Sequence, residues 1–207
     1  MNIDTEAVLN EVIDKMRDIL KIRANDIPNI ELYMDQVTSF IEGQLADSKR
    51  RTNDKLLTKT MINNYTKNDL LPPPVKKKYS KEHVLSLIFI YYFKNILSIN
   101  DIRTILGPIT DKYFGNKDGF NMEDVYNEVF RLEAEESMKV LKDFSKKYGT
   151  AKKAFADFPE EDRQYLQNFA YICLLSYDVY TKKMLIEKII DDIIDDTKNK
   201  ETSLNEK

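Results

Sequence analysis

The sequence predicts an all-α fold, and three features support this prediction. The 207 residues include only 5 glycines and 6 prolines, so few positions interrupt regular structure. Apolar residues recur at helical spacing over long segments of the chain. Hydrophobic residues make up 42% of the chain, enough to form a buried core. We therefore expect a helical bundle with long helices in its C-terminal part.

The first two helices are expected in residues 5–22 and 32–45. Residues 5–22 carry a narrow apolar stripe, which we expect to pack against the core. Pro28 interrupts the pattern, because its ring restricts the preceding residue and cannot continue a helix. The polar residues 46–55 are expected to form an exposed loop. The second helix is expected to bury Val37, Phe40, Ile41 and Leu45.

A short polar helix is expected to begin after Thr58, whose hydroxyl can cap it. Asn68-Asp69 tolerates left-handed geometry and can end this helix, and residues 72–74 are prolines that force an extended exit. One side of the helix carries Met61, Ile62 and Tyr65. The other side carries Thr60, Asn63, Asn64 and Lys67 at i, i+3, i+4 and i+7.

The next two helices have clear start signals. Ser80 can cap a helix that is apolar on nearly all sides, which predicts a position in the middle of the bundle. Ser98, with Asp101 three positions later, resembles a capping box that opens a short helix through Leu106. Gly107-Pro108 is expected to stop that helix.

Two long helices are expected beyond the glycine-bearing loop at residues 115–121, which is the best candidate boundary. The first covers about residues 122–148, with Leu132 among its inward positions. Asp157 with Glu160 can cap the last helix, which is expected to reach about Ile194. Its expected core face comprises Tyr165, Phe169, Ile172, Leu175, Val179, Leu185 and Ile189. The polar tail is expected to fray.

Charge is distributed unevenly along the chain. The formal net charge is −3. Residues 48–82 nevertheless carry 10 basic and 3 acidic side chains, a local charge of +7. Such a block is typical of a phosphate-binding surface, although a solvated lysine surface explains it equally well.

The sequence offers little catalytic chemistry, so we expect no enzyme, no cofactor and no metal site. There is one histidine, His83, and one cysteine, Cys173. Cys173 lies in an apolar helical run, where a buried inert thiol is expected. Two such side chains are too few for a zinc site. No signal peptide, membrane span or lipidation motif is recognised, and the single cysteine fits a cytoplasmic protein.

Residues 57–106 resemble the MerR-type winged helix-turn-helix. Thr58 falls on the cap of the family's recognition helix, Tyr65 on the second tyrosine of its usual pair, Leu70-Leu71-Pro72 on its exit, Tyr79-Ser80 on the start of its apolar helix and Ser98-Ile99-Asn100-Asp101-Ile102 on its last motif. The sequence departs from the family at its two recognition-helix arginines, which are Thr60 and Asn63 here, and at the first tyrosine, which is Asn64. The wing is shortened to residues 75–78, without the usual Arg-x-Tyr hairpin.

A longer segment, from about Ile27 to Leu132, is similar to an uncharacterised family of Gram-positive bacterial proteins known as a domain of unknown function. The expected organisation is an N-terminal amphipathic helix over residues 1–26, a helix-turn-helix-like domain over 27–112, a C-terminal helical region for packing or dimerisation over 120–196, and a frayed tail over 197–207.

The MerR resemblance implies a transcriptional regulator that binds double-stranded DNA. The recognition helix would enter the major groove, where the amides of Asn63 and Asn64 can read adenine. The expected phosphate contacts are Lys59, Thr60, Lys67, Arg50, Arg51, Lys76, Lys77 and Lys78. A homodimer, formed through the first or the last helices, would place two such helices roughly 34 Å apart. The sequence names no effector.

A different class of function fits the same residues. A winged-helix scaffold can serve as a non-enzymatic protein-interaction module, with Lys76 to Lys81 meeting an acidic surface. Peripheral membrane binding by the basic loop has less support, because no apolar anchor accompanies it.

Overall fold

The computed structural model describes residues 5–19 and 22–205 and has a mostly helical chain, as the sequence predicts. The described residues form seven α-helices, two short 3-10 helices and one two-stranded sheet. The α-helices are α1 (Thr5–Ile19), α2 (Met34–Gln44), α3 (Lys59–Lys67), α4 (Lys81–Phe93), α5 (Ile99–Tyr113), α6 (Met122–Ala151) and α7 (Glu160–Asn205). The other elements are η1 (Ala24–Asp26), η2 (Ala46–Ser48), β1 (Leu32–Tyr33) and β2 (Lys78–Tyr79).

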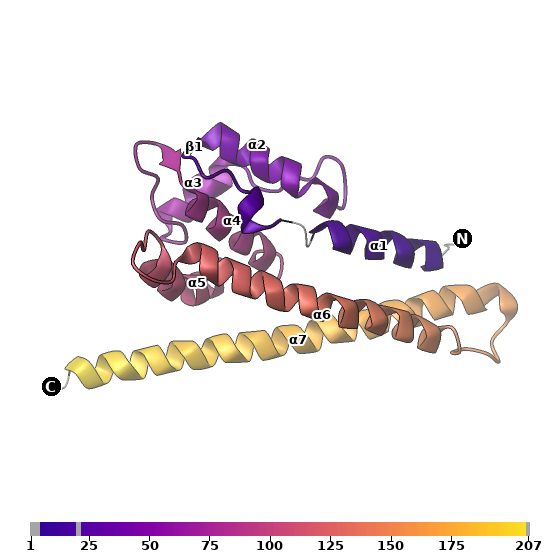
Figure 1. Ribbon diagram of the computed structural model, residues 1–207. Coiled ribbons are helices and arrows are strands. Elements are labelled where there is room, and N and C mark those ends of the chain that lie inside the picture. The colour runs from indigo at the N-terminus through magenta and orange to yellow at the C-terminus, as the bar shows by residue number, and fades with distance from the viewer. Residues whose placement is uncertain (1–4, 20–21, 206–207) are drawn as a thin grey trace.

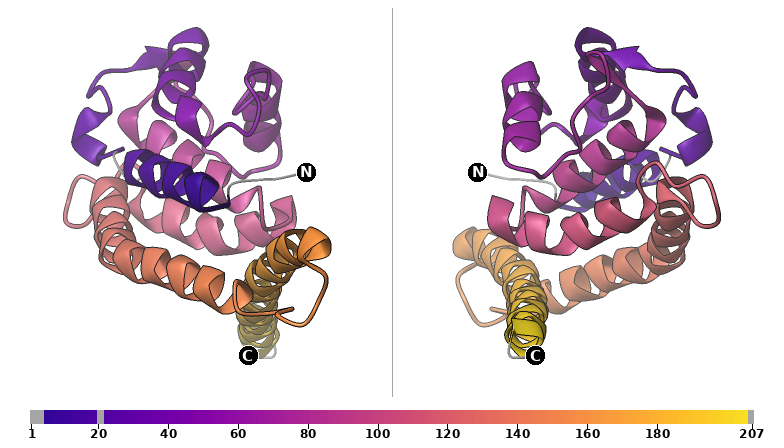
Figure 2. Two further views of the ribbon diagram at one scale, coloured as in Figure 1. Left: turned by 90° about the vertical axis from the view of Figure 1, so that its right-hand side faces the viewer. Right: turned by 90° about the vertical axis from the view of Figure 1, so that its left-hand side faces the viewer.

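Helix α4 lies at the centre of the core, as its apolar sequence predicts. Val84, Leu85, Leu87 and Ile90 have none of their surface exposed. Helices α2, α3, α5 and α6 surround α4, and α6 and α7 form a long pair along one side of the molecule (Figure 1). In both views of Figure 2, α7 lies at the edge farthest from α2. The core therefore sits in the N-terminal part, and the C-terminal helices cover one side of it.

The second helix begins two residues later than expected, because Leu32 and Tyr33 form a strand. β1 pairs with β2 in antiparallel register, Leu32 opposite Tyr79 and Tyr33 opposite Lys78. The Tyr33 amide then donates to the side chain of Gln36 at 2.8 Å, which starts α2. Strand pairing gives the backbone of both segments hydrogen-bond partners. The helical spacing of apolar residues near residue 32 carries no information about β2, which lies 46 residues further along the chain.

Helix α5 runs through Gly107-Pro108, so the predicted stop is wrong. The Pro108 ring is exposed, and its missing N–H costs one backbone hydrogen bond. Burial of Ile102 and Leu106 before the proline and of Thr110 after it favours one continuous helix. The Thr110 hydroxyl also donates to the Gly107 carbonyl at 2.8 Å, in the turn that follows the one the proline weakens.

Helix α7 packs on two different neighbours in succession. Its first half lies against α6, where the Tyr171 hydroxyl donates to the Phe144 carbonyl at 3.2 Å and Lys147 pairs with Asp178 at 2.7 Å. Its second half reaches α5, where Ile190 is buried. The helix continues to Asn205, past the predicted end near residue 194 and into the segment that was expected to fray.

The core face predicted for α7 is wrong. Tyr165, Phe169, Ile172 and Val179 are 70%, 54%, 59% and 65% exposed, and Leu185 and Ile189 are also exposed. Only Leu175 of that set is half-buried. In α6, Leu132 is exposed instead of inward, and the Cys173 thiol of α7 is exposed instead of buried. The spacing correctly indicated an apolar face, but the single chain does not cover it.

Candidate nucleic-acid interface

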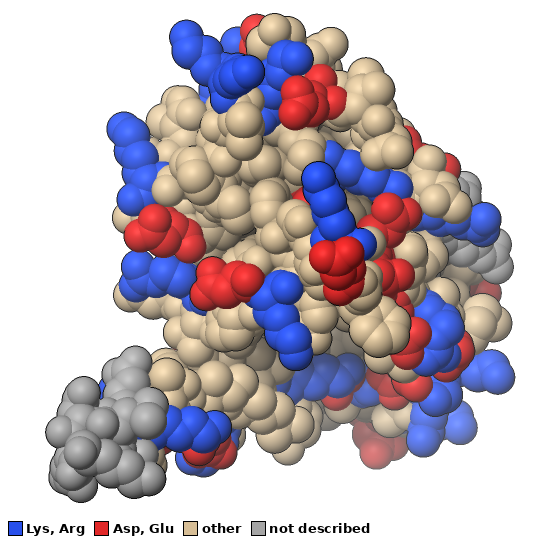
Figure 3. Space-filling model, turned by 60° about the vertical axis from the view of Figure 1, so that its left-hand side comes forward, with Lys and Arg blue, Asp and Glu red and all other residues tan. Residues whose placement is uncertain are grey.

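The candidate interface comprises α3, the loop before it and the hairpin that ends in β2. Figure 3 shows the side of the molecule that lies on the left in Figure 1, where the hairpin is located. Lysine and arginine side chains are spread over the edges and the middle of this side, and acidic side chains lie beside several of them (Figure 3). The basic block of the sequence is therefore a surface of mixed charge in the fold.

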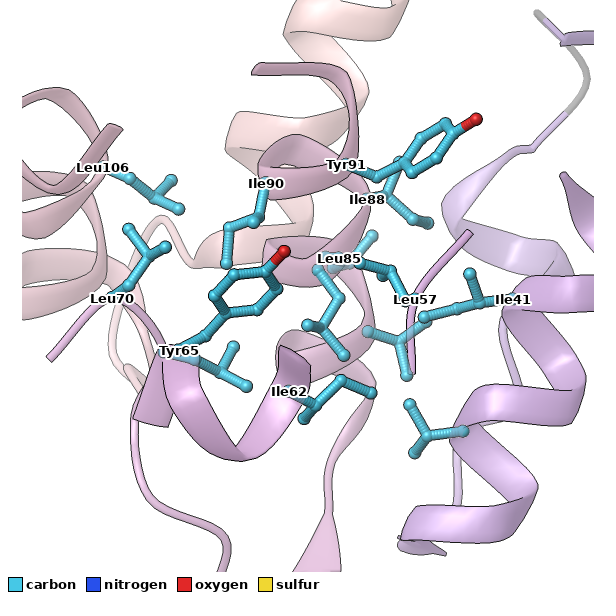
Figure 4. Close-up of a cluster of buried hydrophobic side chains, with 14 of the residues drawn as sticks. Ile41, Leu57, Ile62, Tyr65, Leu70, Leu85, Ile88, Ile90, Tyr91 and Leu106 are labelled. Carbon is cyan, nitrogen blue, oxygen red and sulfur yellow. The ribbon is translucent and has the colours of Figure 1, made fainter. Parts of the chain in front are cut away.

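Helix α3 has the cap and the two faces that the sequence predicts. The Thr58 hydroxyl accepts a hydrogen bond from the Met61 amide at 3.2 Å. Ile62 and Tyr65 are buried and point toward α4 (Figure 4). Asp69, just beyond the helix, adopts the left-handed φ of 55° expected at a helix end. The opposite face is exposed and carries Thr60, Asn63, Asn64 and Lys67.

The exposed face of α3 offers two amides that make no side-chain hydrogen bond in the described part of the chain, those of Asn63 and Asn64. A free amide can donate and accept at the same time, as bidentate pairing with adenine requires. Burial of Ile62 and Tyr65 fixes the orientation of this face, so the amides stand on a rigid element.

The shortened wing is a tight two-residue hairpin. The Val75 amide donates to the Lys78 carbonyl at 3.1 Å, and the Lys78 amide donates to the Val75 carbonyl at 2.9 Å. The two residues at the tip, Lys76 and Lys77, have φ angles of 50° and 64°. Two successive left-handed residues define a turn that favours Asn-Gly, because a Cβ is strained there. Two lysines therefore occupy left-handed backbone positions, where a residue with a Cβ is strained.

Helix α3 and the hairpin contact the same short segment, residues 31–35. Lys59, at the start of α3, forms an ion pair with Asp35. Lys78 lies 3.4 Å from Glu31 and 5.8 Å from the centre of the Tyr33 ring. Lys59 and Lys78 therefore each have a carboxylate partner, and the two partners lie within the same five-residue segment. Among the described residues, Lys67, Lys76 and Lys77 have no ion pair.

Arg50 and Arg51 lie apart from the hairpin. The loop that carries them begins at the end of α2 that is distant from β1 (Figure 1). It is held there by an ion pair between Lys49 and Glu42 and by a 2.6 Å hydrogen bond between Ser48 and Tyr91. An 11-residue helix such as α2 is roughly 16 Å long. These two arginines are exposed, but they do not join Lys76 and Lys77 in one patch.

The sequence patterns did not predict that acidic residues belong to the interface. Glu31 and Asp35 flank β1, and their position depends on the pairing of β1 with β2. Lys81 belongs to the basic block of the sequence, but in the structure it forms a 2.8 Å ion pair with Glu123 at the start of α6. No local pattern could reveal these partners, because each one comes from an element distant in sequence.

His83 has a structural setting. Its side chain is buried, and its Nδ1 accepts a hydrogen bond from the Ser80 amide at 2.9 Å, which caps α4. The Phe114 ring contacts it edge-on at 4.7 Å between centroids. Burial lowers the pKa of His83, and the carbonyls of Pro73 and Pro72 act in the opposite direction. In the described residues no three metal-ligating side chains gather at one point, and no helix is long and apolar enough to cross a membrane.

Comparison with known proteins identifies a family. Searches of curated proteins and of solved structures gave no match. A family model described as a domain of unknown function, DUF1836, matches residues 22–129, which are 108 of the 207 residues. The matched region begins before η1 and ends within α6, so it contains α2 to α5 and both strands. The chain therefore belongs to the DUF1836 family, whose function is unknown.

Proposed function

We propose that this protein is a cytoplasmic, DNA-binding transcriptional regulator whose α2–α5 region acts as a MerR-like winged helix-turn-helix. In this proposal α3 is the recognition helix and the Val75–Lys78 hairpin is a short wing. The supporting observation is that a rigid helix with a polar exposed face and a strained lysine hairpin contact the same five-residue segment.

The α3 face supplies base readout in this proposal. Asn63 and Asn64 would pair with base edges in the major groove, and Thr60 and Lys67 would contact the flanking phosphates. α3 is a nine-residue helix, and its exposed residues lie within two turns, which fits a contact of a few base pairs.

The hairpin supplies phosphate contacts. Lys76 and Lys77 lie at its tip and have no ion pair among the described residues, so their charge is available to a ligand. Non-glycine residues with positive φ cost free energy and are concentrated at functional sites. A lysine pair maintained in this conformation supports a role in binding an anion.

A second candidate function is a protein-interaction module. The carboxylates of Asp35 and Glu31 neutralise Lys59 and Lys78, so the surface attracts a polyanion less than the sequence implies. A mixed surface of this kind suits a protein partner with complementary charges. Both candidates require no catalysis, and they differ in their response to DNA.

The test is recovery of DNA from a genomic mixture. Purified protein is incubated with sheared genomic DNA at physiological salt, and the bound fragments are sequenced. We expect enrichment of a few sites, with the enrichment lost in the Asn63→Ala/Asn64→Ala variant. Asn127→Ala, an exposed amide on α6, is the matched control and should behave as the unaltered protein. Absence of retention by folded protein would support the protein-interaction module.

A further inference from the structure

We propose that a hollow between α1, α6 and α7 binds a free alkyl carboxylate, a medium-chain fatty acid, with its chain inside the hollow and its carboxylate at Lys182. The proposal does not depend on DNA binding, because the hollow shares no lining residue with α3 or the hairpin. Three properties of the hollow support it: the apolar wall, the volume and the position of one lysine.

Side chains from three helices form the wall of the hollow. In Figure 1, α1 lies beside the α6–α7 pair at the end of the molecule away from the hairpin. The volume is about 400 Å³, within the range of roughly 300–1,000 Å³ that is typical of small-molecule sites. Covering an apolar wall removes it from water, which favours an apolar ligand. The wall is largely apolar and includes Val8, Leu9, Val12, Val140, Phe144 and Leu175.

Hydrogen bonds made by lining residues join the helices around the hollow. The Thr5 hydroxyl of α1 donates to the Asn168 side chain of α7 at 2.8 Å. The Tyr171 hydroxyl of α7 donates to the Phe144 carbonyl of α6 at 3.2 Å. The hollow is therefore preformed, and a ligand does not have to separate the helices in order to enter.

Lys182 is the polar lining group that remains available to a ligand. Thr5 and Tyr171 already donate their hydroxyl protons within the chain. Asp178 forms a 2.7 Å ion pair with Lys147. Lys182 is exposed and makes neither a hydrogen bond nor an ion pair among the described residues. A lysine stem can line an apolar hollow while its ammonium group stays in water, so the ligand's charged end is expected at the mouth.

The charges beside the hollow favour an anion over a cation. Lys147 also pairs with Asp143. This contact lowers the pKa of Asp143, and Lys182 and Lys146 act in the same direction. The three lysines and the two carboxylates, Asp143 and Asp178, have a net charge of +1. A carboxylate would neutralise this charge, whereas a cation would add to it.

The volume of the hollow limits the length of the chain. A cavity of about 150 Å³ holds one benzene ring, so 400 Å³ has room for a chain on the order of ten carbons. Each CH₂ group that enters should tighten binding about fourfold. Affinity should therefore increase with chain length until the hollow is filled and then level off. An amphiphile adsorbed on the exposed apolar surface of α7 would show no such limit.

The first experiment is a chain-length series in titration calorimetry. The full chain is titrated with the even-numbered carboxylates from hexanoate to tetradecanoate, each below its micelle concentration. We expect one site per chain and an affinity that increases about fourfold per carbon up to about decanoate, with little gain beyond it. An increase that continues to tetradecanoate, or the absence of saturable binding by folded protein, would overturn the proposal.

The second experiment fills the hollow. Val12 lines it and is 40% exposed, so the larger side chain of Val12→Trp can be accommodated without disruption of the core. This variant should bind decanoate at least tenfold more weakly, because the indole takes the space of two or more CH₂ groups. Met184→Trp, on α7 at 52% exposure and outside the hollow, is the matched control and should bind as the unaltered protein. Unchanged binding by folded Val12→Trp would contradict the proposal.

The third experiment compares head groups on a chain of eight carbons. Lys182→Gln should weaken octanoate binding by up to about fivefold, the effect of one exposed ion pair, and should leave binding of 1-octanol unchanged. Lys183→Gln removes the neighbouring lysine, which pairs with Glu187 at 3.6 Å outside the hollow, and should change neither. Octyltrimethylammonium should bind more weakly than octanoate to the unaltered protein. If it binds equally well, or if the two lysine variants behave alike, Lys182 does not select a carboxylate and the proposal is wrong.

A last measurement separates a free carboxylate from a membrane lipid. Phosphatidylglycerol offers the same apolar chain and an anionic head, but its two longer chains exceed the hollow. The full chain should therefore remain in solution when phosphatidylglycerol vesicles are sedimented. Sedimentation with the vesicles that is lost in Val12→Trp would assign the hollow to a lipid chain of the bilayer and overturn the choice of a free ligand.

Discussion

Lys78 and Glu31 form an ion pair that connects the hairpin to the segment before α2. The Lys78 Nζ lies 3.4 Å from the Glu31 carboxylate, and both side chains are partly exposed. An exposed pair contributes at most about 1 kcal/mol to folding. Its larger effect is on the charge of the surface. Glu31 cancels one positive charge at the base of a hairpin whose tip carries two lysines.

Removal of the Glu31 carboxylate should strengthen DNA binding. Glu31→Gln leaves Lys78 unpaired, so we expect the protein to release about one more counterion on binding and its affinity to depend more steeply on salt. Fluorescence anisotropy with a recovered site, measured over a salt series, checks this. Glu42→Gln, which frees Lys49 away from the hairpin, is the matched control and should leave the slope unchanged. Equal slopes for Glu31→Gln and the unaltered protein would contradict the prediction.

The lysines at the hairpin tip should lower the stability of the fold and raise its affinity for DNA. Lys76→Asn/Lys77→Gly suits two left-handed residues, so we expect stability to rise by about 1 kcal/mol in urea unfolding. DNA affinity should fall at the same time, because two positive charges are lost.

A charge-matched variant separates the two effects. Lys76→Gln/Lys77→Gln removes the same charges without relieving the backbone, so it should lose affinity to the same extent and gain no stability. If this variant is stabilised as much as Lys76→Asn/Lys77→Gly, backbone strain is not the cause.

Tyr126 should contribute to stability through its hydroxyl. This buried hydroxyl donates to the Ile22 carbonyl at 2.8 Å, across 104 residues of sequence. Burial raises the pKa of Tyr126, so the group remains a neutral donor. Tyr126→Phe should destabilise the fold by about 1–2 kcal/mol, since it leaves a buried carbonyl without that partner. Tyr177→Phe, at an exposed position, should leave the urea midpoint unchanged.

The stability of the fold should decrease below neutral pH because of His83. Burial places its pKa in the folded protein below the ordinary value of 6.5. The unfolded chain therefore binds the proton more readily, and the stabilising contribution is present above pH 6.5 and lost as the pH falls toward the folded pKa. Protonation of Nδ1 would also break the hydrogen bond from the Ser80 amide. Melting temperatures measured from pH 7.5 to 5 check the effect.

His83→Gln is the informative comparison for that titration. Glutamine is a normal capping-box residue at this position and accepts from the Ser80 amide without titrating. Its melting temperature should fall less than that of the unaltered protein over the same range. Parallel curves for the two proteins would show that other groups control the acid sensitivity.

Local sequence determined most helices and the two faces of α3. The Thr58 cap, the left-handed end at Asp69 and the pattern of Ile62 and Tyr65 act within one or two turns, so they can be predicted without the fold. The apolar sequence of α4 likewise predicted its central position, because a helix without a polar face must be surrounded.

Structural features that depend on residues distant in sequence were decided only by the tertiary structure. The continuation of α5 through Pro108 depends on packing after the proline, and β1 depends on a strand 46 residues away. Glu31 and Asp35 lie at the candidate site only because β1 pairs with β2. The sequence by itself specified an apolar stripe on α7, since spacing follows from helix geometry. The fold decided that most of the stripe stays exposed, because α6 and α5 cover other residues of the same helix, among them Tyr171 and Ile190.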